Sequence, residues 1–175
     1  MARLPYADLS NPACSQLVKQ IIAERGSVLH LYQMLLHSPP IARGWLTHLT
    51  AIRQQSSLPG SIRELIIMRV AHLNRAPYEA QQHAPIALKE GLTQAQLDAL
   101  ENWNDTDLFD ERQRTVLAYT DAMTLNIQVS DTLFNAVKSL YNADEVVELT
   151  ATIATYNMVS RFLEALQIHN DDPRI

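Results

Sequence analysis

The chain has few of the residues on which several common kinds of active site depend. Cys14 is its single cysteine, so neither an intrachain disulfide nor a Cys-x-x-Cys redox pair can form. Four glycines are present, and none of them belongs to a glycine-rich phosphate loop or a Gly-x-Ser-x-Gly motif. The sequence therefore excludes dithiol redox chemistry within one chain and gives no support to phosphate-loop or serine-nucleophile chemistry.

Basic tracts and long apolar runs are also absent. The formal net charge is −5, with both signs spread along the chain, so we expect no nucleic-acid partner. No apolar run approaches the roughly 18 residues of a membrane helix. The first six residues lack the apolar core of a signal peptide. We therefore expect a cytoplasmic protein with no membrane partner.

What the sequence does contain is apolar residues at helical spacing. It has 175 residues, of which 47% are hydrophobic, and this suffices for one domain with a substantial core. No alternating segment of strand length is present. We predict an all-α fold, a single-domain bundle of about seven or eight helices that covers residues 1–175.

Capping patterns predict where several of these helices begin and end. Proline suits the first turn of a helix, and glycine suits the position just after its end. A polar first residue with Glu or Gln three positions later forms a capping box. These rules predict helix starts at Ser61, Pro77, Thr93, Asp110, Ser130 and Asn142, and a helix end at Gly91.

The helix predicted from Asn142 to about Ile168 is apolar on more than one side. Val146, Val147 and Met158 are examples. Such a helix lies deep in a domain or packs against another subunit.

Four residues on two consecutive predicted helices form the strongest candidate for a site. Glu64 lies near the start of one helix, and Tyr78, Glu79 and His83 lie in the first turns of the next. Glu79 and His83 are four residues apart and share a helix face. A carboxylate beside an imidazole fixes its tautomer, as in many general acids and bases. We therefore predict acid/base chemistry at this cluster.

Simpler interpretations of the same residues remain open. Glu64 is the fourth residue of the Ser61 pattern and is also a candidate capping glutamate. Glu79 and His83 also fit a surface pair worth a few tenths of a kcal/mol. Together the three side chains have the composition of a facial metal triad, but the chain lacks a His-Glu-x-x-His pattern, and we predict no metal. Arg69, His72 and Arg75 are candidate carboxylate ligands or ordinary solvated residues.

Several segments resemble the carboxymuconolactone decarboxylase family, which includes the AhpD-type alkylhydroperoxidases. They are Arg-Glu-Leu-Ile-Ile-x-Arg-Val-Ala at 63–71, Tyr-Glu-x-x-x-His at 78–83 and Ala-Leu-Lys-Glu-Gly-Leu-Thr at 87–93. Segments 118–122 and 148–162 are similar to long members of that family. The resemblance implies an AhpD-like helical bundle, with a family core at about 40–125, that assembles into trimers or hexamers.

The resemblance also carries expectations about chemistry. The peroxidase-type members have two cysteines where this chain has Ala76 and Glu79, so peroxidase activity is not expected from this site. The decarboxylase branch needs no cysteine pair. By this resemblance His83 donates a proton, Glu64 or Glu79 tunes it, and Arg69 or His72 holds a substrate carboxylate, with no cofactor.

Three hypotheses follow from the sequence. The first is a carbon–carbon lyase of the decarboxylase type that acts on a small carboxylated molecule, with His83, Glu64, Glu79 and Tyr78 in its site. The second is a peroxidase related to AhpD. The third is a non-catalytic helical oligomer that binds a small ligand.

Overall fold

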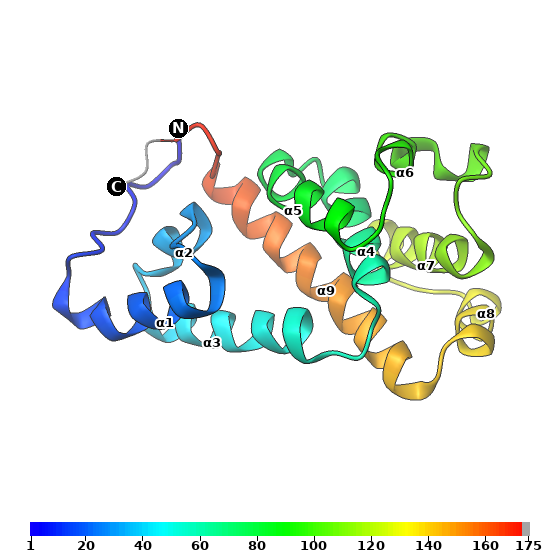
Figure 1. The fold of residues 1–175 in the computed structure, drawn as a ribbon, viewed down its shortest axis with the longest axis horizontal. Coiled ribbons are helices and arrows are strands. Elements are labelled where there is room, and N and C mark those ends of the chain that lie inside the picture. The colour runs from blue at the N-terminus through cyan, green and yellow to red at the C-terminus, as the bar shows by residue number, and fades with distance from the viewer. Residues whose placement is uncertain (173–175) are drawn as a thin grey trace. The chain divides into compact units, whose positions relative to one another are not determined.

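The computed structural model describes residues 1–172, and this part of the chain is all-α, as predicted. It has nine α-helices, more than the seven or eight expected (Figure 1). No helix in residues 1–172 is both long enough and apolar enough to cross a membrane. The α-helices are α1 Ser15–Arg25, α2 His30–Leu35, α3 Pro39–Thr50, α4 Gly60–Leu73, α5 Pro77–Lys89, α6 Gln94–Asp98, α7 Glu111–Asp121, α8 Asp131–Leu140 and α9 Ala143–Leu166.

Four short helical segments lie at the ends of these helices or between them. Two are 3₁₀ turns, η1 Pro12–Cys14 and η3 Leu100–Asp105. The other two are π-helical turns that continue α3 and α7, η2 Ala51–Gln55 and η4 Ala122–Asn126. The described chain groups into two compact units, residues 1–55 with 163–172, and residues 56–162. The single-domain assignment stays a prediction.

The first unit contains α1, α2 and α3. Every residue of α2 is buried, so this short helix is enclosed by its surroundings. The Tyr6 hydroxyl donates to the Asp172 carboxylate at 2.6 Å, and the Arg3 amide donates to the Leu166 carbonyl at 2.9 Å. These bonds join the first residues of the chain to its last described ones.

The second unit is built around α4, which packs against α5 and α7 (Figure 1). Most of α4 is buried, because its apolar residues cover more than one side of the helix. A core of aliphatic and aromatic side chains lies on this helix and its neighbours. Its members are Leu65, Met68, Ala87, Leu92, Leu100, Phe109 and Leu117. Burial of each such side chain is worth roughly 1.5–3 kcal/mol, so this core fixes the position of α4 in the second unit.

Most of the predicted helix caps are confirmed. Thr93 and Asp110 form complete capping boxes with Gln96 and Gln113. Ser130 accepts a hydrogen bond from the Leu133 amide at the start of α8. At the start of α9, Asn142 and Glu145 exchange backbone and side-chain hydrogen bonds.

The ends of α5 also follow the prediction. Pro77 occupies the first turn, and Gly91 lies just beyond the last turn with a left-handed φ of 104°. α9 ends at Leu166, two residues before the predicted Ile168.

The predicted start of α4 at Ser61 is wrong. The helix begins at Gly60 with Pro59 at the N-cap, and no side chain caps it. Glu64 is fully buried and does not accept from the Ser61 backbone. The capping interpretation of this glutamate therefore fails, and its carboxylate is available to the interior of the unit.

Candidate active site

A carboxylate and an imidazole meet in the interior between α4 and α5. Oε2 of Glu64 lies 2.7 Å from Nδ1 of His83. Glu64 is 0% exposed and His83 is 8% exposed. On the other side of the carboxylate, Nε of Arg63 donates to Oε1 at 3.3 Å. Arg63 and His83 thus contact the two oxygens of this carboxylate.

This geometry assigns separate roles to the two ring nitrogens of His83. When Glu64 is ionised it can only accept a hydrogen bond, and the contact then requires the proton on Nδ1 of His83. In the neutral ring, Nε2 is then the basic nitrogen. The Tyr156 ring meets the His83 ring edge-on, with centroids 5.1 Å apart. Glu64 and Tyr156 together fix the ring orientation, which a general acid or base requires.

Glu79 lies on the same side of α5 as His83, but its carboxylate accepts a hydrogen bond from α9. The Ser160 hydroxyl donates to Oε2 of Glu79 at 2.7 Å in a buried position. Tyr156 and Ser160 are four residues apart on α9, as Glu79 and His83 are on α5. Since Glu79 meets Ser160 and His83 meets Tyr156, the two helices run in opposite directions here. Tyr78, the fourth predicted catalytic residue, is 4% exposed.

Arg69 lies in an internal ion pair. Its Nε and Nη2 donate to the two oxygens of Asp121 at 2.6 and 2.7 Å, and its Nη1 donates to the Leu100 carbonyl at 2.5 Å. Nε1 of Trp103 donates to the same Asp121 carboxylate at 3.0 Å. These bonds tie α4 to α7 and η3, so the guanidinium of Arg69 is occupied by the protein itself.

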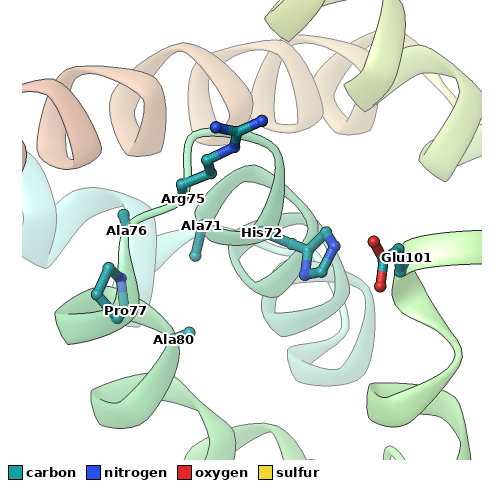
Figure 2. A pocket seen from close by; sticks show the side chains of 7 residues that line it. All are labelled: Ala71, His72, Arg75, Ala76, Pro77, Ala80 and Glu101. Atoms are coloured by element: carbon teal, nitrogen blue, oxygen red, sulfur yellow. The ribbon is translucent and has the colours of Figure 1, made fainter.

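The other predicted substrate ligand, His72, lines a surface pocket of about 490 Å³ at the turn between α4 and α5. In Figure 2 the His72 ring is directed toward the carboxylate of Glu101, which comes from η3. The remaining lining residues are Ala71, Arg75, Ala76, Pro77 and Ala80. Ala76, one of the two positions where the resemblance places a cysteine, is therefore part of the pocket wall.

No set of three or more His, Cys, Asp or Glu side chains within residues 1–172 is placed to hold a metal ion. Cys14 is 4% exposed and its Sγ lies 3.9 Å from the Leu36 carbonyl oxygen. It belongs to the first unit, whereas Glu64, Glu79 and His83 all belong to the second.

The structure thus brings together some predicted site residues and separates others. Glu64 and His83 are in contact, Glu79 is held by Ser160, and Arg69 is held by Asp121. Sequence reasoning assigned no role to Tyr156, Ser160 or Glu101. No sequence signal singled out any of the three. Tyr156 and Ser160 lie among other polar residues of α9, such as Thr152, Asn157 and Arg161.

Comparison with known proteins finds a family match in the middle of the chain. The model of the carboxymuconolactone decarboxylase family matches residues 39–122, which include Glu64, Glu79 and His83. Residues 39–122 thus match the carboxymuconolactone decarboxylase family, in agreement with the resemblance found in the sequence, and the chain has no Cys-x-x-Cys pair.

Two sequence relatives of this chain are uncharacterized proteins. YdfG of Bacillus subtilis is 29% identical over 115 residues, which are 65% of this chain and 78% of YdfG. YnjA of Escherichia coli is 26% identical over 126 residues, which are 71% of this chain and 66% of YnjA.

Comparison with solved structures establishes the fold of this chain. The AhpD core of a peroxidase-related protein from Ralstonia eutropha superposes with a TM-score of 0.83 at 19% identity, covering 98% of this chain and 93% of that one. A variant of the debrominase Bmp8 in complex with 2,3,4-tribromopyrrole gives a TM-score of 0.82 at 16% identity, covering 98% and 95%. The predicted AhpD-like fold is thereby confirmed. At these identities, the similarity establishes the fold and not the activity.

Proposed function

We propose that this protein is an acid/base enzyme of the decarboxylase type, a carbon–carbon lyase that acts on a small carboxylated organic molecule. The observation that carries the proposal is the 2.7 Å contact between Glu64 and Nδ1 of His83, with both side chains almost entirely withdrawn from water. A carboxylate–imidazole pair in such an environment is typical of a general acid or base.

In the proposed reaction, the bond between a lactone carbon and its carboxylate breaks and CO2 leaves. The electron pair remains on the carbon, where conjugation with the ring spreads the charge. Protonated Nε2 of His83 then delivers a proton to that carbon, and solvent returns a proton to the imidazole. Glu64 stabilises the imidazolium before transfer and keeps Nδ1 protonated after it.

Glu79 and Tyr78 have supporting roles in this proposal. Glu79 connects α5 to α9 through Ser160 one turn before His83, and so helps to fix the helix that carries the imidazole. Tyr78 is buried in the first turn of the same helix. Arg69 stabilises the second unit through Asp121 and is not proposed as a ligand of the substrate.

The test is CO2 release from carboxymuconolactone by the wild-type protein and by His83→Gln and Glu64→Gln. We expect His83→Gln to lose about 10²-fold or more of kcat, since general acid–base catalysis contributes about 10²–10⁴-fold. Glu64→Gln keeps a hydrogen bond to the ring but loses the charge, so its kcat should fall and its pH–rate profile should shift. Undiminished turnover by His83→Gln would refute the mechanism.

A binding protein without turnover is the second candidate, and one observation favours it. His83 does not line the pocket beside His72, and only 8% of its surface is exposed. Ligand binding in that pocket, with no CO2 release from any carboxylated lactone, would favour this candidate over the enzyme.

A dithiol peroxidase receives no support from the site. Ala76 and Glu79 occupy the positions of the two cysteines, and the lone Cys14 is buried in the other unit. Peroxide consumption that disappears in Cys14→Ser would be required to revive this hypothesis.

A further inference from the structure

The pocket at the α4–α5 turn has charged side chains that no other part of the described chain engages. His72, Arg75 and Glu101 line it and are exposed. Within residues 1–172, none of these three side chains forms a hydrogen bond or ion pair. The other lining residues are apolar, and in Figure 2 they lie to the left of His72 and Glu101: Ala71, Ala76, Pro77 and Ala80. An apolar floor with a few polar groups at its rim is typical of small-molecule sites.

The backbone of Arg75 gives a second, independent observation. Arg75 has a left-handed φ of 53° immediately after α4. The Ala76 amide bonds to the Ala71 carbonyl at 2.8 Å, and the Arg75 amide bonds to the His72 carbonyl at 3.1 Å. This is the Schellman ending of a helix, in which glycine is the usual residue at the left-handed position. After α5 the same position is taken by Gly91.

An arginine at this position is a strained choice where glycine would serve the backbone better. Its side chain makes no bond within residues 1–172 that would compensate for the strain. The guanidinium, at the rim of the pocket, suits a planar anion such as a carboxylate.

We propose that this pocket binds a small organic acid that also carries a hydroxyl or amino group. Arg75 binds the carboxylate, and a ring N–H of His72 donates to it. Glu101, whose carboxylate lies beside the His72 ring in Figure 2, accepts a hydrogen bond from the hydroxyl or amino group. The inference goes beyond the proposed function, because His83 does not line this pocket and the pocket is proposed as a separate binding site.

The test compares three probes of one shape: 3-hydroxybenzoate, benzoate and 3-hydroxybenzamide. Their dissociation constants are measured by calorimetry on the full-length protein. We expect 3-hydroxybenzoate to bind most tightly, because it alone offers both a carboxylate to Arg75 and a hydroxyl to Glu101. Equal affinity for all three probes, or no binding of any at millimolar concentration, would overturn the inference.

Two variants test the roles of Arg75 and Glu101 separately. Arg75→Gly should weaken 3-hydroxybenzoate about tenfold or more and leave 3-hydroxybenzamide unchanged, since a charge-assisted bond is lost. Glu101→Gln should narrow the difference between 3-hydroxybenzoate and benzoate. Wild-type affinities in Arg75→Gly would also overturn the inference.

The chain offers a matched control for the strained backbone. Gln167 follows α9 with a left-handed φ of 52° and has the same pair of hydrogen bonds, from its own amide to Glu164 and from Ile168 to Leu163. Glycine at either position relieves the same strain, so both variants should melt at temperatures at least as high as the wild type. Only Arg75→Gly should lose affinity for the acid.

Binding and turnover are separated by His83→Gln. This variant should bind 3-hydroxybenzoate as the wild type does, because His83 does not line the pocket. Selective binding together with absent CO2 release would leave the inference standing and refute the proposed enzyme. Loss of selectivity with retained CO2 release would refute the inference and leave the proposed enzyme standing.

Discussion

Glu64 and Gln113 each take the last position of a capping-box pattern, but their side chains have different partners in the structure. Each stands in a four-residue pattern that predicts a capping box. Asp110 caps α7 through Gln113, whereas Glu64 turns inward to Arg63 and His83. The difference arises from a partner 19 residues away on the next helix. Spacing along the chain identified the candidate residues but could not choose between the two functions.

Arg69 is a second residue whose partner is distant in the sequence and was not predicted. The sequence presented it as a free cation near the candidate site, and the structure gives it Asp121, 52 residues further along the chain. Its guanidinium side chain is 7% exposed, and that of Asp121 is 23% exposed. A charge so enclosed depends on its partner for stability.

We therefore predict that Asp121→Asn destabilises the protein strongly. The new amide presents an NH2 group to donors of Arg69 and Trp103, and the guanidinium stays buried without its counter-charge. The free energy of unfolding should fall by about 3 kcal/mol, as expected when a buried ion pair loses one partner. Urea unfolding followed by circular dichroism measures this change.

The matched control is Asp98→Asn on the exposed face of α6. Within residues 1–172, the Asp98 side chain bonds only to Gln94 on its own helix, so the same chemical change should alter the unfolding free energy by less than about 0.5 kcal/mol. If both variants lose equal stability, the Arg69 pair is not what ties α4 to α7.

At the scale of helices, local chemistry predicted the ends and missed the irregular turns. Caps involve residues within four positions of one another, so the sequence shows them directly. The π-helical turns η2 and η4 place one extra residue in a helical turn, and no local residue pattern marks them. η4 is followed by Ile127 with a left-handed φ of 66°, which is unusual for a β-branched residue. Such turns are set by packing between helices and not by propensity.

Side-chain bonds between α1 and α3 provide a prediction at this scale. The hydroxyl of Thr50 donates to Oε2 of Glu24 at 2.5 Å, and the amide of Gln20 donates to Oε1 at 2.9 Å. These two bonds, that of Thr50 foremost, hold the pKa of the Glu24 carboxyl below its ordinary value. A lowered carboxyl pKa stabilises the folded state above the unfolded pKa, and this contribution disappears as the pH falls through the folded pKa.

Thr50→Val should therefore destabilise the protein at pH 7 by about 1 kcal/mol and much less at pH 3. The difference in unfolding free energy between wild type and variant should shrink as the pH falls below the ordinary carboxyl range. Chemical denaturation at a series of pH values between 3 and 7 measures it.

Thr47→Val is the control, because the Thr47 hydroxyl donates to the Arg43 carbonyl of its own helix. Its effect should not depend on pH in this range. A pH-independent effect in Thr50→Val would contradict the role assigned to the Glu24 bond.

At the scale of the whole molecule, α9 has one exposed apolar side. Val147 is 67% exposed and Met158 is 39% exposed, and Ala154 between them is also exposed. With Ala151, which is partly buried, these residues recur at intervals of four, three and four positions and so share one side of the helix. Contiguous exposed apolar surface on a helix indicates an interaction site. This side is where we place the subunit contact that the family resemblance implies.

We accordingly predict a trimer or hexamer in solution that Ala154→Glu dissociates. Alanine at the middle of this exposed apolar side lets another helix approach closely. A carboxylate at the same position would be buried without a partner in the assembly. In an isolated chain the same carboxylate stays in water, so the variant should retain its helicity. Light scattering on a size-exclusion column should report a lower mass for this variant. Gln16→Glu adds the same charge at an exposed position of α1 and should leave the assembly intact. A wild-type protein that elutes as a monomer, or an Ala154→Glu assembly of unchanged mass, would place the contact elsewhere or remove it.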